Sequence, residues 1–228
     1  PRRAGEAARA LMDETAAVVG VDDASYLDVP ICGRLADRRW TEGIGTTDSH
    51  EMAVSRLARM LQAACYITIA YLSGMRDSEI KHLQRGCATV VRDENGVPYR
   101  WLVRSLAFKG ENNPMGVEAT WVIGEPASRA ISVLESLIAP DNPWMFAPIP
   151  LGPGTGPAKR STTKAMIGTA TINSLNEFVT WVNTYCNTRA IDDRIPDVDG
   201  KSWHLTTAQF RRTLAWFIAR RPGGAIAG

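Results

Sequence analysis

The strongest constraint on the fold is a run of helical periodicity that fills residues 52–73 and ends at a glycine. Apolar side chains recur in this run at intervals of three and four residues, so one face of a long helix can be buried. Gly74 follows the run at the place where helices commonly end. Asp48 and Glu51 lie three residues apart before it and form a capping-box pattern. We therefore predict a long amphipathic helix over these residues.

The residues after Gly74 indicate a second, shorter helix and then a small antiparallel sheet. Residues 87–92 form a short segment rich in β-branched side chains, two further strand-like segments follow it, and a Glu-Asn-Gly turn at residues 94–96 separates the first two segments. We expect the helix at about residues 78–86 and the strands at residues 87–92, 99–108 and 117–123.

Helical patterns dominate the rest of the chain, so the predicted fold class is α+β and mostly helical. Residues 147–169 interrupt these patterns with four prolines and four glycines, which is typical of a loop. In the last helix, Leu214, Phe217 and Ile218 are expected to form the buried face. The three helices are expected at residues 126–138, 171–187 and 208–220, and Thr206 or Thr207 is expected to cap the last of them.

The first 47 residues differ from the rest of the chain. A weak, alanine-rich helical pattern over residues 3–19 precedes irregular sequence rich in Gly and Asp. We expect residues 1–47 to be a linker or the tail of a missing upstream domain, and residues 48–228 to form one domain.

Composition excludes several classes of protein. No apolar run is as long as a membrane span requires, so no span is expected. The four cysteines include no C-x-x-C pair, and the three histidines do not lie near them at zinc-ligand spacing. Neither a metal site nor a disulfide scaffold is therefore predicted. Reduced thiols favour a cytoplasmic protein.

The net charge is only +2, but the positive charge is unevenly distributed. From Lys201 onward the charged side chains are all lysine or arginine, which suits a surface that faces phosphates. A solvated helix end explains the same charges. Lys159, Arg160 and Lys164 in the Pro- and Gly-rich loop are candidate contacts to backbone phosphates, with a solvated loop as the alternative.

Other basic residues stand near the ends of predicted elements. Arg76 lies in the segment GMRDSEI, just after the helix-ending glycine, and Glu79 one helical turn later is placed to orient its guanidinium. Lys109 lies in FKGENN, where a strand enters a hairpin turn. Arg211 and Arg212 lie in LTTAQFRRTLA, within an otherwise apolar helix.

Each of these residues has a structural alternative to a functional role. Arg76 can be a surface cation near a helix C-terminus, where positive charge is favourable. Lys109 can be an ordinary turn lysine, and Arg211 can form an ion pair between helices. Arg212 is expected to contact a phosphate or an acid. Glu79 is either an acid at a helix start or the support of the neighbouring arginine.

Taken together and in this order, the three segments resemble the tyrosine recombinases, the phage-integrase family. GMRDSEI looks like that family's first-arginine box, Lys109 with Gly110 like its β-hairpin lysine, and FRRTLA like its second-arginine box. The resemblance covers roughly residues 50–221, and the type IB topoisomerases are more distant relatives. It implies that Arg76, Lys109 and Arg211 are catalytic, that residues 48–228 are an integrase-like catalytic domain, and that the missing upstream domain binds DNA.

The resemblance also implies a reaction. A tyrosine attacks a DNA phosphate, forms a 3′-phosphotyrosyl link and frees a 5′-hydroxyl. Two arginines clamp the non-bridging oxygens, where charge builds in the transition state. A lysine protonates the leaving oxygen. The resemblance further implies no metal or cofactor, double-stranded DNA as partner, a synaptic multimer on DNA, an origin in a mobile element, and association with the bacterial nucleoid.

The sequence departs from the family at the position of a histidine. That histidine usually precedes the second arginine by three residues, and here Ala208 occupies its place. His204 lies seven residues before Arg211 and is a weak candidate for a comparable role in proton relay. Either the histidine has been lost or another group serves in its place.

The second departure concerns the nucleophile. The family's tyrosine lies well downstream of the second arginine, but the segment from Arg212 to Gly228 contains no tyrosine. We therefore expect the native protein to continue beyond Gly228, and the chain by itself to be inactive. The alternative is a non-catalytic DNA-binding or regulatory protein derived from a recombinase. The target site, the direction of recombination, the host and the oligomeric state stay open.

Overall fold

The computed structural model describes residues 10–11, 14–15, 17–18, 26–35, 37–47, 51–149 and 164–222. The chain divides into two compact units, Pro1–Val54 and Ser55–Gly228. Three predicted features, the capping residue Asp48 and the loop cations Lys159 and Arg160, lie outside the described residues.

The first unit carries little regular structure, in keeping with its Gly- and Asp-rich sequence. Strands β1 (Arg34–Leu35) and β2 (Arg38–Arg39) form a two-stranded antiparallel hairpin. Asp37 in the turn has a φ of 59°, a left-handed conformation that aspartate tolerates better than most residues. The described residues between 10 and 18 are helical, as the alanine-rich pattern predicts.

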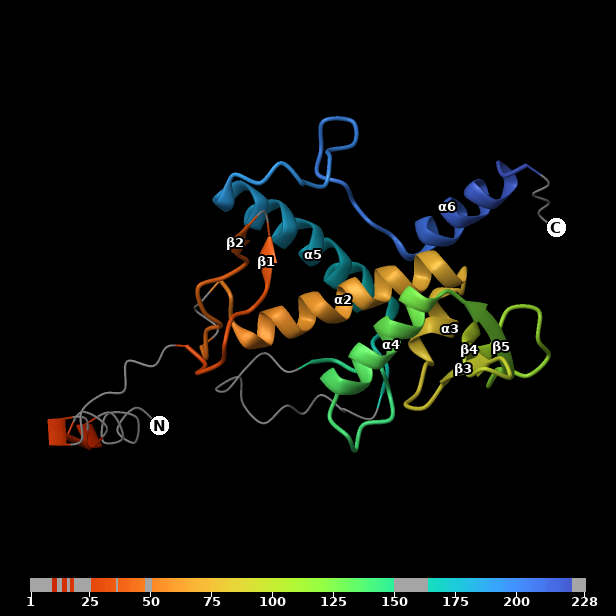
Figure 1. Ribbon diagram of the computed structural model, residues 1–228, viewed down its shortest axis with the longest axis horizontal. Coiled ribbons are helices and arrows are strands. Elements are labelled where there is room, and N and C mark those ends of the chain that lie inside the picture. Colours follow the sequence, from red (N-terminus) through yellow and green to blue (C-terminus); the bar gives the residue numbers. More distant parts are fainter. Residues whose placement is uncertain are drawn as a thin grey trace. The chain divides into compact units, whose positions relative to one another are not determined.

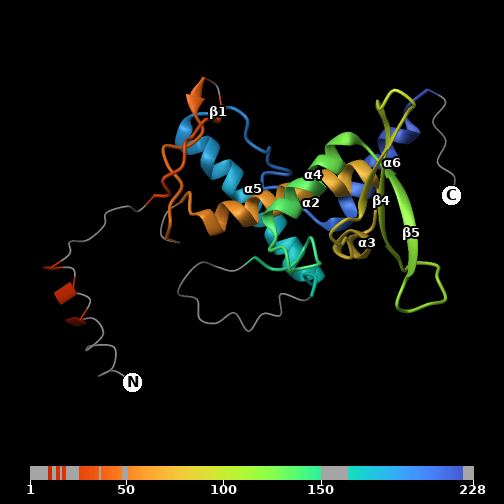
Figure 2. The ribbon, with the colours of Figure 1, turned by 60° about the horizontal axis from the view of Figure 1, so that its bottom comes forward.

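The second unit is built on helix α2 (Val54–Ser73), and the predicted long helix is confirmed. Helix α2 contributes Tyr66, Ile69 and Ala70 to a core cluster that also takes side chains from the sheet and from the other helices. Figures 1 and 2 show α4, α5 and α6 around α2, with α3 and the sheet near its C-terminal end. The helix ends before Gly74, whose φ of 66° is the left-handed conformation expected there.

The second predicted helix is much shorter than expected. Helix α3 spans only Asp77–Lys81, and the prediction of helix as far as Gly86 was wrong. The residues after His82 pair with a distant segment instead: Met145 N donates to Leu83 O at 3.1 Å, and Gln84 forms a bridge with Trp144. This nonlocal pairing satisfies the backbone and overrides the local helical pattern.

The predicted sheet is confirmed. Strands β3 (Ala88–Arg92), β4 (Pro98–Ala107) and β5 (Val117–Ile123) form an antiparallel sheet in the order β3-β4-β5. Val103 and Ser105 on one face of β4 are buried, and Arg104 between them is exposed. This alternation is what a sheet with one covered face requires.

The three remaining helices agree with the predicted segments to within one turn. Helix α4 spans Glu125–Leu137, α5 spans Gly168–Arg189 and α6 spans Thr207–Ala219. Thr206 is the N-cap of α6, and its N–H donates to Gln209 Oε1 at 2.9 Å. None of the described helices is long and apolar enough to cross a membrane.

The predicted buried face of α6 was wrong in part. Phe210 is the buried side chain of this helix, whereas Phe217 and Ile218 are 46% and 41% exposed. Trp216 is 49% exposed, and the Arg220 guanidinium lies over its ring, 4.2 Å from the ring centroid. Helix α6 is therefore most deeply buried at Phe210, in its N-terminal half.

Candidate functional site

Arg76 is held by Glu79 through two hydrogen bonds. Arg76 is the N-cap residue of α3, and its backbone N–H donates to Glu79 Oε2 at 2.6 Å. Its guanidinium Nη1 donates to Glu79 Oε1 at 3.0 Å. The contact expected from the three-residue spacing is therefore present, and both carboxylate oxygens are used. The Arg76 side chain keeps 36% of its surface exposed, so the guanidinium can still reach an external anion.

Glu79 is anchored from the side of the sheet as well. Glu79 is 2% exposed, and its carboxylate needs the two hydrogen bonds from Arg76 because burial of an unpaired carboxylate is costly. Ser105 Oγ, on the covered face of β4, donates to Glu79 O at 2.5 Å. The backbone that carries Glu79 is thus fixed to β4, and through it the orientation of Arg76.

Lys109 lies in the turn between β4 and β5, as predicted. Phe108 precedes it and packs on His82 at the C-terminal end of α3, with 4.7 Å between ring centroids. Gly110 follows with a φ of 90°, a conformation that suits glycine. Lys109 itself is exposed and makes no hydrogen bond or ion pair with the other described residues.

Arg211 and Arg212 lie on α6, which packs against the junction between α2 and α3. Leu214 contacts the turn at Gly74: a Cβ atom placed on that glycine would lie 3.1 Å from Leu214 Cδ2. Phe210 meets Tyr66 of α2 with 6.2 Å between ring centroids. The side chains of both arginines are exposed, and among the described residues neither has an ion-pair or hydrogen-bonding partner. The alternative of an interhelical ion pair is therefore not observed for Arg211.

The three predicted segments converge on α3. The turn with Lys109 packs on its C-terminal end, Arg76 caps its N-terminal end, and α6 with Arg211 packs on the turn that leads into it. The charged ends of these arginine and lysine side chains are accessible to solvent, and they lie on three elements that are far apart in the sequence. Each of these side chains is of a type that binds an anion, because arginine forks match the oxygens of a phosphate and lysine adds a mobile charge.

The remaining candidate residues do not join this group through any described contact. His204 precedes α6 and is exposed, and its backbone oxygen accepts from Gln209 Nε2 at 3.3 Å. Ala208 is exposed in the first turn of α6 and carries no polar group. Lys201 lies in a tight turn paired with Val198. Lys164 lines a separate cavity of about 570 Å³ beside α2 and α5.

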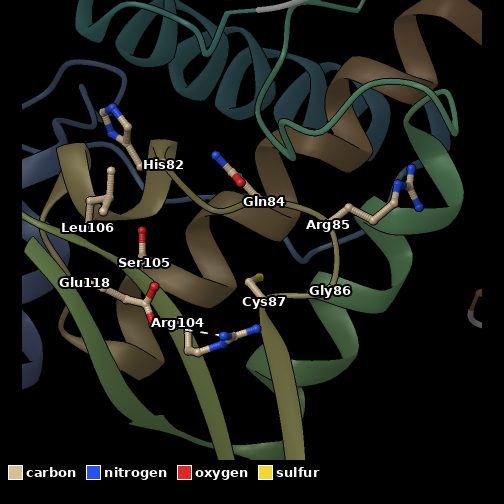
Figure 3. A pocket seen from close by; sticks show the side chains of 9 residues that line it. All are labelled: His82, Gln84, Arg85, Gly86, Cys87, Arg104, Ser105, Leu106 and Glu118. Atoms are coloured by element: carbon tan, nitrogen blue, oxygen red, sulfur yellow. Dashed lines mark ion pairs between the residues drawn. The ribbon is translucent and has the colours of Figure 1, made fainter. Parts of the chain in front are cut away.

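A second cavity, of about 240 Å³, lies between β4 and the segment that precedes β3, and most of the side chains that line it are polar. In Figure 3, Arg85 points away from it toward α4, where its guanidinium donates to the backbone oxygens of Glu135 and Ile138 at 2.8 and 2.9 Å. Arg104 and Glu118 are 3.9 Å apart and largely exposed, so their pair contributes little. The Arg85 guanidinium is thus bound to α4, and the Arg104–Glu118 pair is screened by solvent. We assign no function to this cavity.

Sequence reasoning missed the residues that support the arginines. Ser105 and Tyr66 are buried polar side chains whose partners lie 26 and 11 residues away in the sequence. In the sequence, the only indication for either residue was a polar group at a position on the buried face of its strand or helix. Among the described residues, no cluster of three or more His, Cys, Asp or Glu side chains is suited to a metal ion.

Comparison with known proteins adds no family to this description. Neither the models of known protein families nor the curated proteins contain a match to this chain.

Proposed function

We propose that this chain is the catalytic domain of a tyrosine recombinase, which cuts and rejoins DNA through a covalent 3′-phosphotyrosyl intermediate. The observation that carries the proposal is that the segments containing Arg76, Lys109 and Arg211 all pack at α3 or at the turn that leads into it. The three residues have the types, and occur in the order, that the motifs of this family require. The elements that separate them along the chain are a short helix, a three-stranded antiparallel sheet and two further helices, which is the order that the resemblance implies.

In the proposed reaction the two arginines bind the non-bridging oxygens of one phosphate. Their charge is permanent, and their geometry favours the transition state, in which those oxygens gain negative charge. Glu79 fixes the fork of Arg76 before DNA arrives, so less entropy is lost on binding. Lys109 is free to move and donates a proton to the 5′-oxygen as the phosphodiester bond breaks.

The attacking tyrosine is proposed to lie beyond residue 228. The tyrosine hydroxyl gives up its proton to solvent as its oxygen forms the new bond to phosphorus, and the 5′-oxygen leaves with the bonding electrons and takes a proton from Lys109. The link stores the energy of the broken bond, so rejoining needs no external energy source. The partners are double-stranded DNA and further copies of the protein in a synaptic complex, and the proposed setting is a mobile element in a bacterial cell.

Ala208 favours a second candidate function. This residue stands where the family has a histidine for proton transfer, and its methyl side chain cannot move a proton. A recombinase-derived protein that binds DNA without cleaving it fits this observation. It would use the same exposed cations but form no covalent intermediate.

A covalent-trapping experiment distinguishes the two functions. The full-length gene product is incubated with nicked duplex DNA, and protein–DNA adducts that resist denaturant are measured. The recombinase proposal predicts an adduct that disappears when Arg211 is changed to Ala or when the downstream tyrosine is changed to Phe. Binding without any adduct supports the second function, and an adduct that persists in the Arg211→Ala variant refutes the first.

A further inference from the structure

One buried side chain contacts the immediate neighbours of both arginines. Tyr66 in α2 is 2% exposed, and its hydroxyl donates a hydrogen bond to Asp77 Oδ1 at 2.8 Å. Asp77 directly follows Arg76. The ring of Tyr66 meets Phe210 in an edge-on arrangement, and Phe210 directly precedes Arg211. The two arginine segments, which lie in different halves of the chain, are thus both fastened to Tyr66.

Asp77 is held on its other side by a lysine. Its Oδ2 lies 2.7 Å from Lys81 Nζ, and the two side chains are 24% and 13% exposed. The start of α5 covers this pair: a Cβ atom on Gly168 would lie 3.7 Å from Asp77 Oδ2 and 3.8 Å from Lys81 Nζ. Both oxygens of the carboxylate are therefore occupied, and a hydrogen bond from a hydroxyl to an ionised carboxylate is among the stronger kinds.

Helix α3 needs such an external tie. It has only five residues, and isolated helices of this length are not stable in water. Its direction, and with it the position of its N-cap residue Arg76, must come from contacts with other elements. The bond from Tyr66 fixes the first turn of α3 to α2, and the bond from Ser105 to Glu79 O fixes its middle to β4.

Tyr66 is suited to hold this bond and unsuited to be a nucleophile. Burial raises the pKa of its hydroxyl far above the ordinary value, and the negative charge of Asp77 raises it further. The hydroxyl therefore stays a proton donor across the neutral range. Its surroundings are aromatic, with Phe146 at 5.4 Å between ring centroids, and leave it no access to an external phosphate.

We propose that Tyr66 is a positioning residue, which fixes the Arg76 and Arg211 segments relative to each other through its hydroxyl bond to Asp77 and its ring contact with Phe210. This inference rests on the proposed function, because it matters only if the two arginines bind one phosphate. It assigns Asp77 and Lys81 to the same unit. Tyr66 acts through these neighbours and does not touch DNA.

The test uses Tyr66→Phe, which removes the hydroxyl but keeps the ring that packs on Phe210. The matched control is Tyr71→Phe in the same helix. The ring of Tyr71 contacts Phe217 with 6.4 Å between centroids, and its hydroxyl has no hydrogen-bond partner among the described residues. Asp77→Asn is the complementary variant, since it keeps the shape and removes the charge.

Two quantities are measured on the 228-residue chain. The first is the NMR signal of the Arg76 Nε–Hε group without DNA, which reports whether the guanidinium is fixed. The second is affinity for a duplex of mixed sequence. We expect Tyr66→Phe and Asp77→Asn to shift or broaden the Arg76 signal and to weaken DNA binding by about 3- to 10-fold, which corresponds to the loss of one hydrogen bond. Tyr71→Phe leaves both quantities unchanged.

A double-mutant cycle separates positioning from general stability. In an Arg76→Ala background, Tyr66→Phe causes no further loss of affinity if it acts through Arg76, and causes the full loss again if it merely destabilises the fold. An unchanged Arg76 signal in Tyr66→Phe overturns the inference, even if DNA binding weakens. If the signal changes but Arg76→Ala leaves affinity intact, the proposed function fails and the role inferred for Tyr66 fails with it.

Discussion

Leu214 of α6 packs directly on Gly74, the residue that follows the last residue of α2. Gly74 has a left-handed φ, and a Cβ atom added to it would lie 3.1 Å from Leu214 Cδ2, which places α6 against the turn before Arg76. A residue with a side chain is disfavoured at Gly74 both by the backbone conformation and by the neighbour. Helix α6, which carries Arg211 and Arg212, therefore packs against a position where glycine fits best.

Changing Gly74 to Ala is expected to destabilise the protein by about 2 kcal/mol, with about 1 kcal/mol from the backbone and the rest from the contact with Leu214. Gly96→Ala is the control, because Gly96 has a φ of 78° but nothing within 4 Å of a Cβ atom. Denaturant unfolding of both variants measures the difference. Equal losses for the two variants would show that Leu214 does not press on the turn.

Removing the carboxylate of Glu79 is expected to release Arg76. Glu79→Ala loses the two hydrogen bonds to Arg76 and lowers the free energy of unfolding by about 1–3 kcal/mol. Glu79→Gln keeps one acceptor oxygen, so a smaller loss is expected. Thermal unfolding gives the order of stability of the two variants. If Glu79→Gln is less stable than Glu79→Ala, the assignment of both hydrogen bonds is contradicted.

The basic side chains of α6 are expected to set the salt dependence of DNA binding. Each phosphate contact contributes about 0.9 to the slope of log affinity against log salt concentration. Arg211→Ala and Arg212→Ala are therefore expected to reduce the slope by about one each, whereas Arg129→Ala, an equal loss of charge at an exposed position of α4, leaves it unchanged. Fluorescence anisotropy over a salt series measures these slopes, and three equal slopes would remove α6 from the interface.

The buried thiols predict how stability changes at high pH. Burial raises the pKa of Cys65 from 9.0 to about 11, and burial together with the charge of Glu135 raises that of Cys87 to about 11. Between about pH 9 and 11 the folded protein retains thiol protons that the unfolded chain loses. The free energy of unfolding that the two thiols contribute is therefore fully present below pH 9 and is lost as the pH rises from about 9 to 11. The loss is on the order of 2 kcal/mol per thiol.

Unfolding of the wild type and of the Cys65→Ala, Cys87→Ala double variant between pH 8 and about pH 11 measures this contribution. The double variant is expected to lose stability less steeply, although it starts from a lower value. Tyr66 still contributes in both proteins, since its pKa is raised as well. Parallel stability curves would show that the two thiols titrate alike in the folded and unfolded states.

Local patterns were sufficient for most of the helices and for the whole sheet. The strands β3, β4 and β5 and the turn with Lys109 follow from short strand-like segments bounded by turn residues, and the contact between Arg76 and Glu79 follows from their spacing. These are short-range relationships, which the sequence displays directly.

The errors came from long-range contacts. Helix α3 stops early because residues 83–85 pair with residues 143–145, a segment beyond the sheet and α4 in the sequence. The burial of α6 was misjudged because Phe210 docks on Tyr66 of α2 while Phe217 stays half exposed. The bond between Tyr66 and Asp77 was missed for the same reason, since nothing in the local pattern pairs a tyrosine of one helix with an acid of the next.

The most direct test of the proposed division of labour among Arg76, Lys109 and Arg211 is a comparison of cleavage rates on two leaving groups. The full-length gene product is given nicked duplexes in which the 5′-bridging atom is either oxygen or sulfur. A thiolate leaves without protonation, because the pKa of a thiol is far below that of an alcohol. On the oxygen substrate, we expect Lys109→Ala to slow cleavage by about 10²- to 10⁴-fold and Arg211→Ala to slow it by at least about 10²-fold.

On the sulfur substrate, Lys109→Ala is expected to recover nearly the wild-type rate, whereas Arg76→Ala and Arg211→Ala stay slow. This result would assign proton donation to the lysine and charge stabilisation to the arginines. Sulfur that rescues none of the three variants, or cleavage of the oxygen substrate that survives Arg211→Ala, would contradict these roles.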